Sequence, residues 1–169
     1  LDHQEYLGDD LESIGREKAG IVRAGRPLVC GEPDPPCSVL ETASRLEAPV
    51  LLLGKDFAAE PEDDHTRFRL GQLELRLPLP VLRGAHQFNN AATGLAAVLQ
   101  LLPESARQAD ALWRGLASVD LRGRFDRVAE RPDTWIDVGH NPMGARVIAD
   151  ALRERGAADG RVIRCVLAM

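Results

Sequence analysis

Two short apolar segments on either side of a helical pattern constrain the fold of this chain more than any other feature. RPLVCG (residues 26–31) and PVLLL (residues 49–53) each have the composition of a buried strand. Between them, residues 35–48 place Val39 and Ala43 on one helical face. A crossover of this length joins two parallel strands. The sequence therefore predicts an α/β fold in which helices cover a parallel sheet.

Further elements are predicted on both sides of this unit. We expect a short helix in LESIGREKAG (residues 11–20), closed by Gly20, and a loop over the polar, acidic residues 57–64. Leucines that alternate with polar residues around Gly71 predict a β-hairpin within residues 67–80. Two further helices are expected, over residues 86–102 and 104–119.

The C-terminal part of the chain repeats this alternation after a composition break at residues 120–133. Residues 134–156 read as a strand, a tight turn and a helix, and residues 161–169 as the next parallel strand. Two strands and one helix cannot bury both faces of a parallel sheet, so we expect a chain that is cut at its end, as at its start. The predicted organisation is a first domain, a linker and the start of a second domain, over residues 1–122, 123–131 and 132–169.

Composition excludes several classes of partner. The 169 residues are 44% hydrophobic, which is enough for a globular core. A net charge of -5, without a long run of either sign, and only 4% aromatic residues argue against nucleic-acid binding. The sequence has neither a membrane-spanning run nor a signal peptide, so we expect no membrane partner and a cytoplasmic protein. Three cysteines without CxxC spacing predict no disulfide framework and no zinc site.

A candidate ligand site lies where the predicted strand over residues 134–138 ends. Asp137 stands at this end, and Asn141 followed by Pro142 has the pattern of a helix N-cap and first helical residue. Ligands of open α/β sheets bind at the carboxyl ends of the strands. The alternative is structural, because the same residues could serve only to cap a turn and to start the helix.

His3 and Lys18 are a second candidate pair. Histidine is a common metal ligand, and a neutral lysine amine can add carbon dioxide to become a carbamate, which resembles a carboxylate. Carbamate formation needs a depressed lysine pKa, from burial or a neighbouring cation. The alternative is an ordinary histidine and a solvated lysine that pairs with Glu17.

Four motifs follow one another along nearly the whole chain. They are LDHQEYLGDDLESIGREKAGIVRAGRPLVCGEP (1–33), HQFNNAATGLAAV (86–98), GRF (123–125) and DVGHNP (137–142). Together they resemble the motifs of the folylpolyglutamate synthases and bifunctional dihydrofolate synthases, within the Mur ligase superfamily. The Mur ligases of cell-wall synthesis share the later motifs, whereas LGDDLESIGREKAGI is more typical of the folate branch.

The resemblance implies both a fold and a reaction. The fold is the rear part of a P-loop-type ATPase domain, with a parallel sheet, helices and a β-hairpin, followed by the start of a Rossmann-like C-terminal domain. In the reaction, ATP phosphorylates a carboxylate of dihydropteroate or a folate, and L-glutamate displaces phosphate from the acyl phosphate. The implied enzyme is a monomeric ligase of folate biosynthesis and polyglutamylation that uses two Mg²⁺ sites.

The resemblance also assigns roles to single residues. His3 and Lys18, the latter as a carbamate, match the ligands of the second magnesium, and Lys18 is the implied catalytic residue. A carbamate would add the oxygen ligands that a hard cation prefers. Asn90 matches the contact with the nucleotide base, while Arg124 and Asp137 match contacts with ATP across the domain junction.

The chain departs from the family pattern at several points. His140 and Asn141 keep the HNP signature, to which we assign only the shaping of the junction, with a purely structural role as an equal alternative. Arg122 stands where a proline usually precedes GRF, and Gly139 replaces the usual alanine. The phosphate loop GTNGKGS is absent from the sequence, together with its Lys and Ser. We therefore expect an internal fragment that has no ligase activity and at most weak affinity for ATP.

Two other functions stay open on the sequence alone. A Mur-type ligase would add an amino acid to a UDP-sugar peptide through the same acyl phosphate chemistry. A non-enzymatic interaction module would keep the fold without the phosphate loop. The acceptor substrate separates the first alternative from a folate ligase, and an upstream GTNGKGS in frame would exclude the second.

Overall fold

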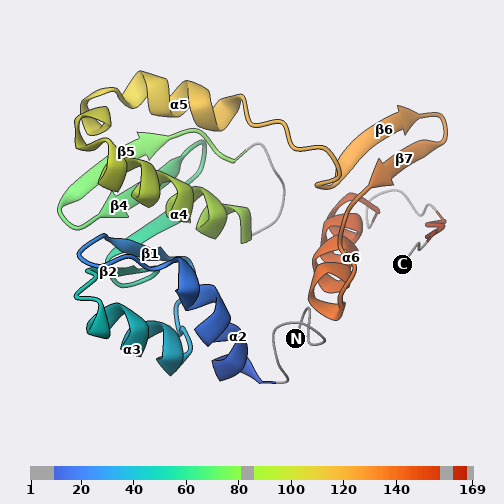
Figure 1. The fold of residues 1–169 in the computed structure, drawn as a ribbon. Helices are drawn as coiled ribbons and strands as arrows, with labels where there is room; N and C mark the ends of the chain where they lie inside the picture. The colour runs from blue at the N-terminus through green and yellow to red at the C-terminus, as the bar shows by residue number, and fades with distance from the viewer. Residues whose placement is uncertain (1–9, 81–85, 157–161, 167–169) are drawn as a thin grey trace. The chain divides into compact units, whose positions relative to one another are not determined.

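The computed structural model describes residues 10–80, 86–156 and 162–166, and the chain divides into two compact units (Figure 1). The first unit comprises Leu1–Pro80 and Ala85–Ser118, and the second comprises Val81–Gly84 and Val119–Met169. Each unit is described by itself below. No helix among the described residues is long and apolar enough to cross a bilayer.

The first unit contains the predicted parallel pair of strands. Strands β1 (Leu28–Cys30) and β2 (Val50–Leu52) pair in parallel, with Leu28 opposite Val50, and helix α3 (Cys37–Arg45) connects them. This confirms the crossover predicted from the spacing of the apolar segments. A small apolar cluster packs beneath α3, and its buried members are Ala19, Val22, Ala43 and Ala48.

Helix α2 (Leu11–Lys18) comes before β1 in the first unit and continues into the short 3-10 helix η1 (Ala19–Ile21). Asp10 caps α2, because its Oδ1 accepts a hydrogen bond of 2.9 Å from the Ser13 backbone N–H. That hydrogen bond lowers the pKa of the Asp10 carboxyl, since it favours the ionised form. The predicted short helix is therefore confirmed, with its α-helical part ending at Lys18.

A three-stranded antiparallel sheet follows, in the order β3 (Phe57–Pro61), β4 (Thr66–Leu70) and β5 (Leu73–Leu77). Its β4–β5 hairpin is the one predicted, and Gly71 in the turn has φ +57°, a conformation that suits glycine. The prediction of a loop over residues 57–64 is wrong for β3. Only two of its side chains, those of Phe57 and Ala59, are buried. The acidic residues that follow them within residues 60–64 give the segment the composition of a loop.

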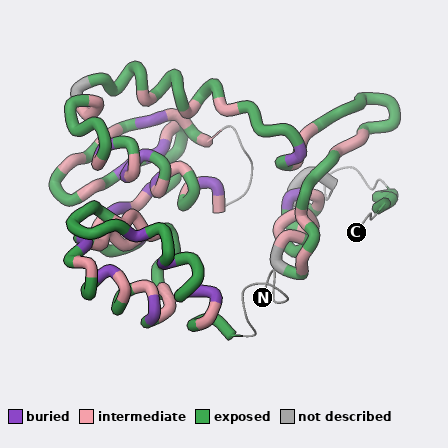
Figure 2. Tube along the Cα trace, viewed as in Figure 1, coloured by how far each residue is buried: buried purple, intermediate pink, exposed green. Residues whose placement is uncertain are grey.

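Helix α4 (His86–Leu101) packs against β3 and also contacts β1 and β4. The main core lies between this helix and the strands, where Figure 2 shows the buried segments. Its fully buried members include Phe57, Phe68, Leu77, Ala92 and Ala96. The helix predicted over residues 104–119 is divided into the 3-10 helix η2 (Pro103–Arg107) and α5 (Ala109–Ala117).

In the described part of the second unit, the regular elements are an antiparallel hairpin and a helix. Strands β6 (Asp126–Glu130) and β7 (Asp133–Ile136) pair with Asp126 opposite Ile136, and helix α6 (Pro142–Gly156) follows. Strand β6 lies within the segment 123–131 that the sequence predicts as a linker. The predicted parallel strand over residues 161–169 is not formed where the structure describes it, because residues 162–166 are exposed and outside any strand.

Candidate functional site

The structure distributes the predicted site residues over both units. His3 lies outside the described residues. Lys18, on α2, and Asn90, on α4, belong to the first unit. The second unit contains the remaining four, which are Arg124, Asp137, His140 and Asn141. Within the second unit these residues come from two loops, one before β6 and one between β7 and α6.

Asp137 joins these two loops through its carboxylate. Its Oδ2 accepts a hydrogen bond of 2.7 Å from the backbone N–H of Phe125, in the GRF loop. Its Oδ1 accepts one of 2.7 Å from the backbone N–H of Gly139, in the loop that leads to α6. A third hydrogen bond of 2.9 Å runs from the Val138 N–H to the Gly123 carbonyl. Two of these bonds, those from the Phe125 and Val138 N–H groups, hold the strand end and the GRF loop together, and the bond from Gly139 orders the loop that leads to α6.

Arg124 lies between two residues whose backbones are in the left-handed region. Gly123 has φ +71° and Phe125 has φ +49°, and the second value is uncommon for a residue other than glycine. The Phe125 ring stacks on Trp135 of β7, with a centroid distance of 4.8 Å and an interplanar angle of 25°. The Arg124 side chain is exposed between these fixed neighbours. The loop thus presents a guanidinium group to solvent from a constrained backbone.

Arg127 extends the stack on the hairpin. Its guanidinium carbon lies 5.9 Å from the centroid of the Trp135 ring, and its Nε donates a hydrogen bond of 2.6 Å to Asp133 Oδ1. That hydrogen bond raises the pKa of the Arg127 guanidinium, because it favours the charged form. Arg127 is thereby engaged in the fold of the hairpin.

Asn141 starts α6 as predicted. Its Oδ1 accepts a hydrogen bond of 2.7 Å from the Gly144 N–H, and its carbonyl accepts one of 2.9 Å from the Ala145 N–H. A Cβ on Gly144 would lie 3.0 Å from Gly139 Cα, so the loop backbone packs directly on the first turn of the helix. The exposed His140 places its Nδ1 2.9 Å from the Val138 carbonyl oxygen.

Asn90 lies near the start of α4 and is exposed. Its Nδ2 donates a hydrogen bond of 3.0 Å to Gln87 Oε1. Gln87 is buried, and its Nε2 lies 2.9 Å from His86 Nε2. The first turn of α4 therefore presents an amide whose orientation is set by a buried neighbour.

Lys18 is exposed at the end of α2. This helix is attached to α3 through Glu12, a residue that no sequence motif indicated. Glu12 accepts hydrogen bonds from the backbone N–H groups of Cys37, at 2.9 Å, and Ser38, at 2.8 Å. These bonds, that from Ser38 above all, lower the pKa of the Glu12 carboxyl. The Ser38 hydroxyl returns a bond of 2.8 Å to the Glu12 carbonyl. Glu12 is thus the cap of α3, supplied by a helix that lies 26 residues earlier.

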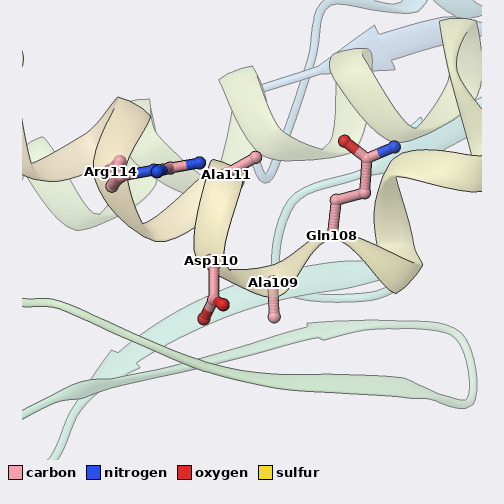
Figure 3. A pocket seen from close by; sticks show the side chains of 5 residues that line it. All are labelled: Gln108, Ala109, Asp110, Ala111 and Arg114. Carbon is pink, nitrogen blue, oxygen red and sulfur yellow. The ribbon is translucent and has the colours of Figure 1, made fainter.

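The described residues do not by themselves form a metal site. Across residues 10–80, 86–156 and 162–166, no group of three or more His, Cys, Asp or Glu side chains is placed to hold an ion. Lys18 would offer the oxygen ligands that Mg²⁺ prefers only as a carbamate. A pocket on the first turns of α5 has none of the predicted site residues in its lining (Figure 3). Its lining comes from one segment, Gln108, Ala109, Asp110, Ala111 and Arg114.

Known proteins resemble nearly the whole of the chain. No protein-family model matches the sequence. The chain is 37% identical over 168 residues to the dihydrofolate synthase/folylpolyglutamate synthase of Escherichia coli K12, covering 98% of this chain and 38% of that protein. The structure of E. coli FolC in complex with DHPP and ADP matches with a TM-score of 0.75 and 36% identity, over 97% of this chain and 37% of that one.

A second solved structure gives the same result. It is a bifunctional folylpolyglutamate synthase/dihydrofolate synthase with Mn, AMPPNP and L-glutamate bound, with a TM-score of 0.75 and 36% identity over 91% of this chain and 36% of that one. These similarities confirm the resemblance read from the motifs and the predicted α/β fold class. The chain spans well under half the length of the proteins it matches.

Proposed function

We propose, since this chain is homologous to part of the dihydrofolate synthase/folylpolyglutamate synthases, that it acts within an ATP-dependent ligase that adds L-glutamate to dihydropteroate, a folate, or both. The observation that carries the proposal is an alignment over 98% of the chain. Solved relatives hold DHPP and ADP in one case, and Mn, AMPPNP and L-glutamate in another. We assign the same classes of substrate to the ligase proposed here.

The proposed reaction has two steps. A carboxylate oxygen of the pteridine substrate attacks the γ-phosphorus of ATP, which forms an acyl phosphate and releases ADP. The amine of L-glutamate then attacks the acyl carbon, so that a C–N bond forms, inorganic phosphate leaves and the amine proton passes to solvent. Catalysis of such steps consists mostly of positioning and of neutralising phosphate charge.

The second unit supports a role in that neutralisation. Arg124 is exposed on a loop held by Asp137 and Phe125, and a guanidinium pairs well with phosphate oxygens. We assign ATP contacts to Arg124 and Asp137, and the contact with the nucleotide base to Asn90. We assign the shaping of the junction to His140 and Asn141, and the hydrogen bond that Asn141 accepts from the Gly144 N–H equally fits the structural alternative, in which it starts α6.

We also propose that Lys18, as a carbamate, and His3 hold a magnesium ion in the complete ligase. The match of Lys18 to the motif supports this proposal. Because Lys18 is exposed, a neighbouring cation such as the metal ion, rather than burial, would favour the carbamate. A bound Mg²⁺ would offset phosphate charge. Lys18→Met should abolish phosphate release, whereas the control Lys55→Met, which removes another exposed lysine, should leave it unchanged. Equal rates for the Lys18→Met variant and the wild type would contradict this role.

The test of the function is phosphate release by the full natural chain that contains residues 1–169. ATP, magnesium, bicarbonate and L-glutamate are supplied with dihydropteroate, tetrahydrofolate or a UDP-sugar peptide as acceptor. We expect release that depends on a pteridine acceptor, and none from residues 1–169 alone, which lack the phosphate loop. That full chain is also expected to be monomeric and cytoplasmic.

A matched pair of arginine variants sharpens the assay. Arg124→Ala should reduce phosphate release strongly, whereas Arg114→Ala, on α5 and outside every motif, should not. Release with the UDP-sugar peptide alone would replace the folate ligase with a Mur-type ligase. Silence with every acceptor would favour the non-enzymatic interaction module.

A further inference from the structure

The GRF loop has a backbone conformation that its sequence alone does not favour. Phe125 has φ +49°, where the Cβ of an ordinary residue comes too close to the backbone. Glycine and asparagine adopt this conformation more readily, but position 125 is neither. Such a conformation persists only where the surroundings determine it. In this loop three neighbours do so, and all of them lie in the second unit.

The first neighbour is Asp137, whose Oδ2 accepts the Phe125 N–H at 2.7 Å. The second is Trp135, whose ring stacks on the Phe125 ring at 4.8 Å. The third is Val138, which donates its N–H to the Gly123 carbonyl at 2.9 Å and would clash with a Cβ on Gly123, at 2.9 Å from its Cγ1. The backbone on both sides of Arg124 is therefore fixed.

The Trp135 ring is itself held in place. The guanidinium carbon of Arg127, on the same hairpin, lies 5.9 Å from the centroid of the Trp135 ring. Asp133 fixes this guanidinium by accepting a hydrogen bond of 2.6 Å from Arg127 Nε. A stack of this kind keeps its geometry better than a lone aromatic ring, because each member restricts the next. The restriction ends at Phe125, the immediate neighbour of Arg124.

We propose that Phe125 is a positioning residue, which through its stack on Trp135 holds the left-handed backbone that aims the Arg124 guanidinium at the phosphates of a bound nucleotide. The inference rests on the proposed function for the contact between Arg124 and ATP. It adds a role for two aromatic residues to which we assign no contact with the substrate. Their effect on binding passes through Arg124, so the two contributions are coupled rather than independent.

The test is a double-mutant cycle on ADP affinity, measured by calorimetry in the full natural chain that contains residues 1–169. Arg124→Ala should weaken ADP binding about tenfold, the loss expected for one charge-assisted contact. Phe125→Ala should weaken it several-fold, and the double variant should be no weaker than Arg124→Ala alone, because the ring acts through the guanidinium. Phe125→Tyr keeps the stack and should restore wild-type affinity.

A second variant tests the stack without changing residue 125, in case Phe125→Ala fails to fold. Trp135→Leu removes the stack and leaves Phe125 in place, and it should weaken ADP binding only while Arg124 is present. The thermal midpoint of each variant separates unfolding from misplacement. Three results would each overturn the proposal. The first is wild-type ADP affinity in both Phe125→Ala and Trp135→Leu, and the second is a loss in these variants that simply adds to that of Arg124→Ala. The third is a wild-type chain that binds no ADP.

The two proposals fail in different measurements. The proposed function fails if phosphate release shows no dependence on a pteridine acceptor. The positioning role concerns ADP binding without any acceptor, so a coupled loss of ADP affinity upholds it even where pteridine turnover is absent.

Discussion

Two carboxylates, one in each unit, accept hydrogen bonds from two backbone N–H groups, yet they hold different things in place. Glu12 accepts from the first two residues of α3, whereas Asp137 accepts from Phe125 and Gly139 in two separate loops. The donors of Glu12 belong to one helix N-terminus, whose partial positive charge favours a carboxylate. Glu12 therefore fastens helix to helix, while Asp137 fastens a loop that presents the exposed Arg124.

The surroundings of the two carboxylates explain this difference. Around Glu12 the contact between α2 and α3 leaves no room for solvent or a ligand, since Ser38 is 4% exposed and a Cβ on Gly15 would lie 2.6 Å from Ser38 Oγ. Around Asp137 the side chains of Arg124 and His140 are exposed. The same hydrogen-bonding device thus serves packing where its neighbours are buried, and can serve ligand contact where they reach solvent.

The largest expected effect comes from filling the contact in the first unit. Gly15→Ala would place its Cβ 2.6 Å from Ser38 Oγ and 2.7 Å from Pro36 Cβ, so α2 must move away from α3. We expect a loss of about 2 kcal/mol in the free energy of unfolding, which is typical of overpacking. Urea unfolding measures it.

Gly94→Ala is the matched control for that variant. Gly94 also lies within a helix, but nothing lies within 4 Å of a Cβ at this position. Alanine there should raise the free energy of unfolding by about 0.5–1 kcal/mol through helix propensity. Equal effects of the two substitutions would show that α2 and α3 do not pack as described.

Glu12→Gln should change how stability depends on pH. The carboxyl has a folded pKa below its ordinary value of 4.5, because it accepts the backbone N–H groups of Ser38 and Cys37. Its stabilising contribution is therefore present above pH 4.5 and is lost as the pH falls through the folded pKa. Urea unfolding between about pH 3 and pH 6 should show a shallower slope for Glu12→Gln than for the wild type.

Glu17→Gln serves as the control for the pH series, since Glu17 is exposed on the same helix. It should keep the wild-type profile. A wild-type slope in Glu12→Gln would mean that the Glu12 carboxylate does not cap α3 in solution.

Asp137→Asn should loosen the loops of the second unit without unfolding the first. The amide retains one acceptor oxygen, so either the Phe125 or the Gly139 N–H loses its partner. We expect a cost of about 1 kcal/mol, the usual value for one hydrogen bond. Amide hydrogen exchange should speed up at Phe125 or at Gly139 and stay unchanged in α3. Unchanged exchange at both amides would contradict the bridging role of Asp137.

The smallest effect is expected where the chain departs from the family pattern. Gly139→Ala would place its Cβ 2.8 Å from Ile148 Cδ1, the far end of a flexible side chain, 3.0 Å from Asp137 Oδ1 and 3.3 Å from the backbone of Gly144. Because its backbone contact is the longer of the two variants' contacts, we expect a loss of about 1 kcal/mol or less. Gly144→Ala would meet the backbone of Gly139 at 3.0 Å, which cannot turn aside, and should cost more. Thermal unfolding of both variants measures the order, and the reverse order would show that the loop is not packed on α6 as described.

Local patterns were sufficient to predict several elements. The spacing of apolar residues predicted the parallel strands β1 and β2 and the helix between them. Alternation around Gly71 predicted the hairpin, and the Asn141–Pro142 pair predicted the start of α6. Each signal is contained within a few residues, because periodicity and capping are properties of one element.

Other elements left no such pattern. Strand β3 buries only Phe57 and Ala59, and β6 has no buried residue, so neither resembles a strand in composition. Both are strands because a neighbouring strand accepts and donates their backbone hydrogen bonds. The sequence motifs identified Lys18 and Arg124, whereas nothing in the sequence predicted the stack of Phe125 on Trp135 beside Arg124.

By itself, the sequence determined the α/β class, the local elements with strong periodicity and the motifs that relate the chain to folate ligases. Only the tertiary structure decided which groups meet, as with Glu12 and α3, or Asp137 and the GRF loop. The physical reason is that a carboxylate can accept from any backbone N–H that packing brings within reach. Which N–H that is depends on the fold of residues up to 26 positions apart, and no local pattern encodes it.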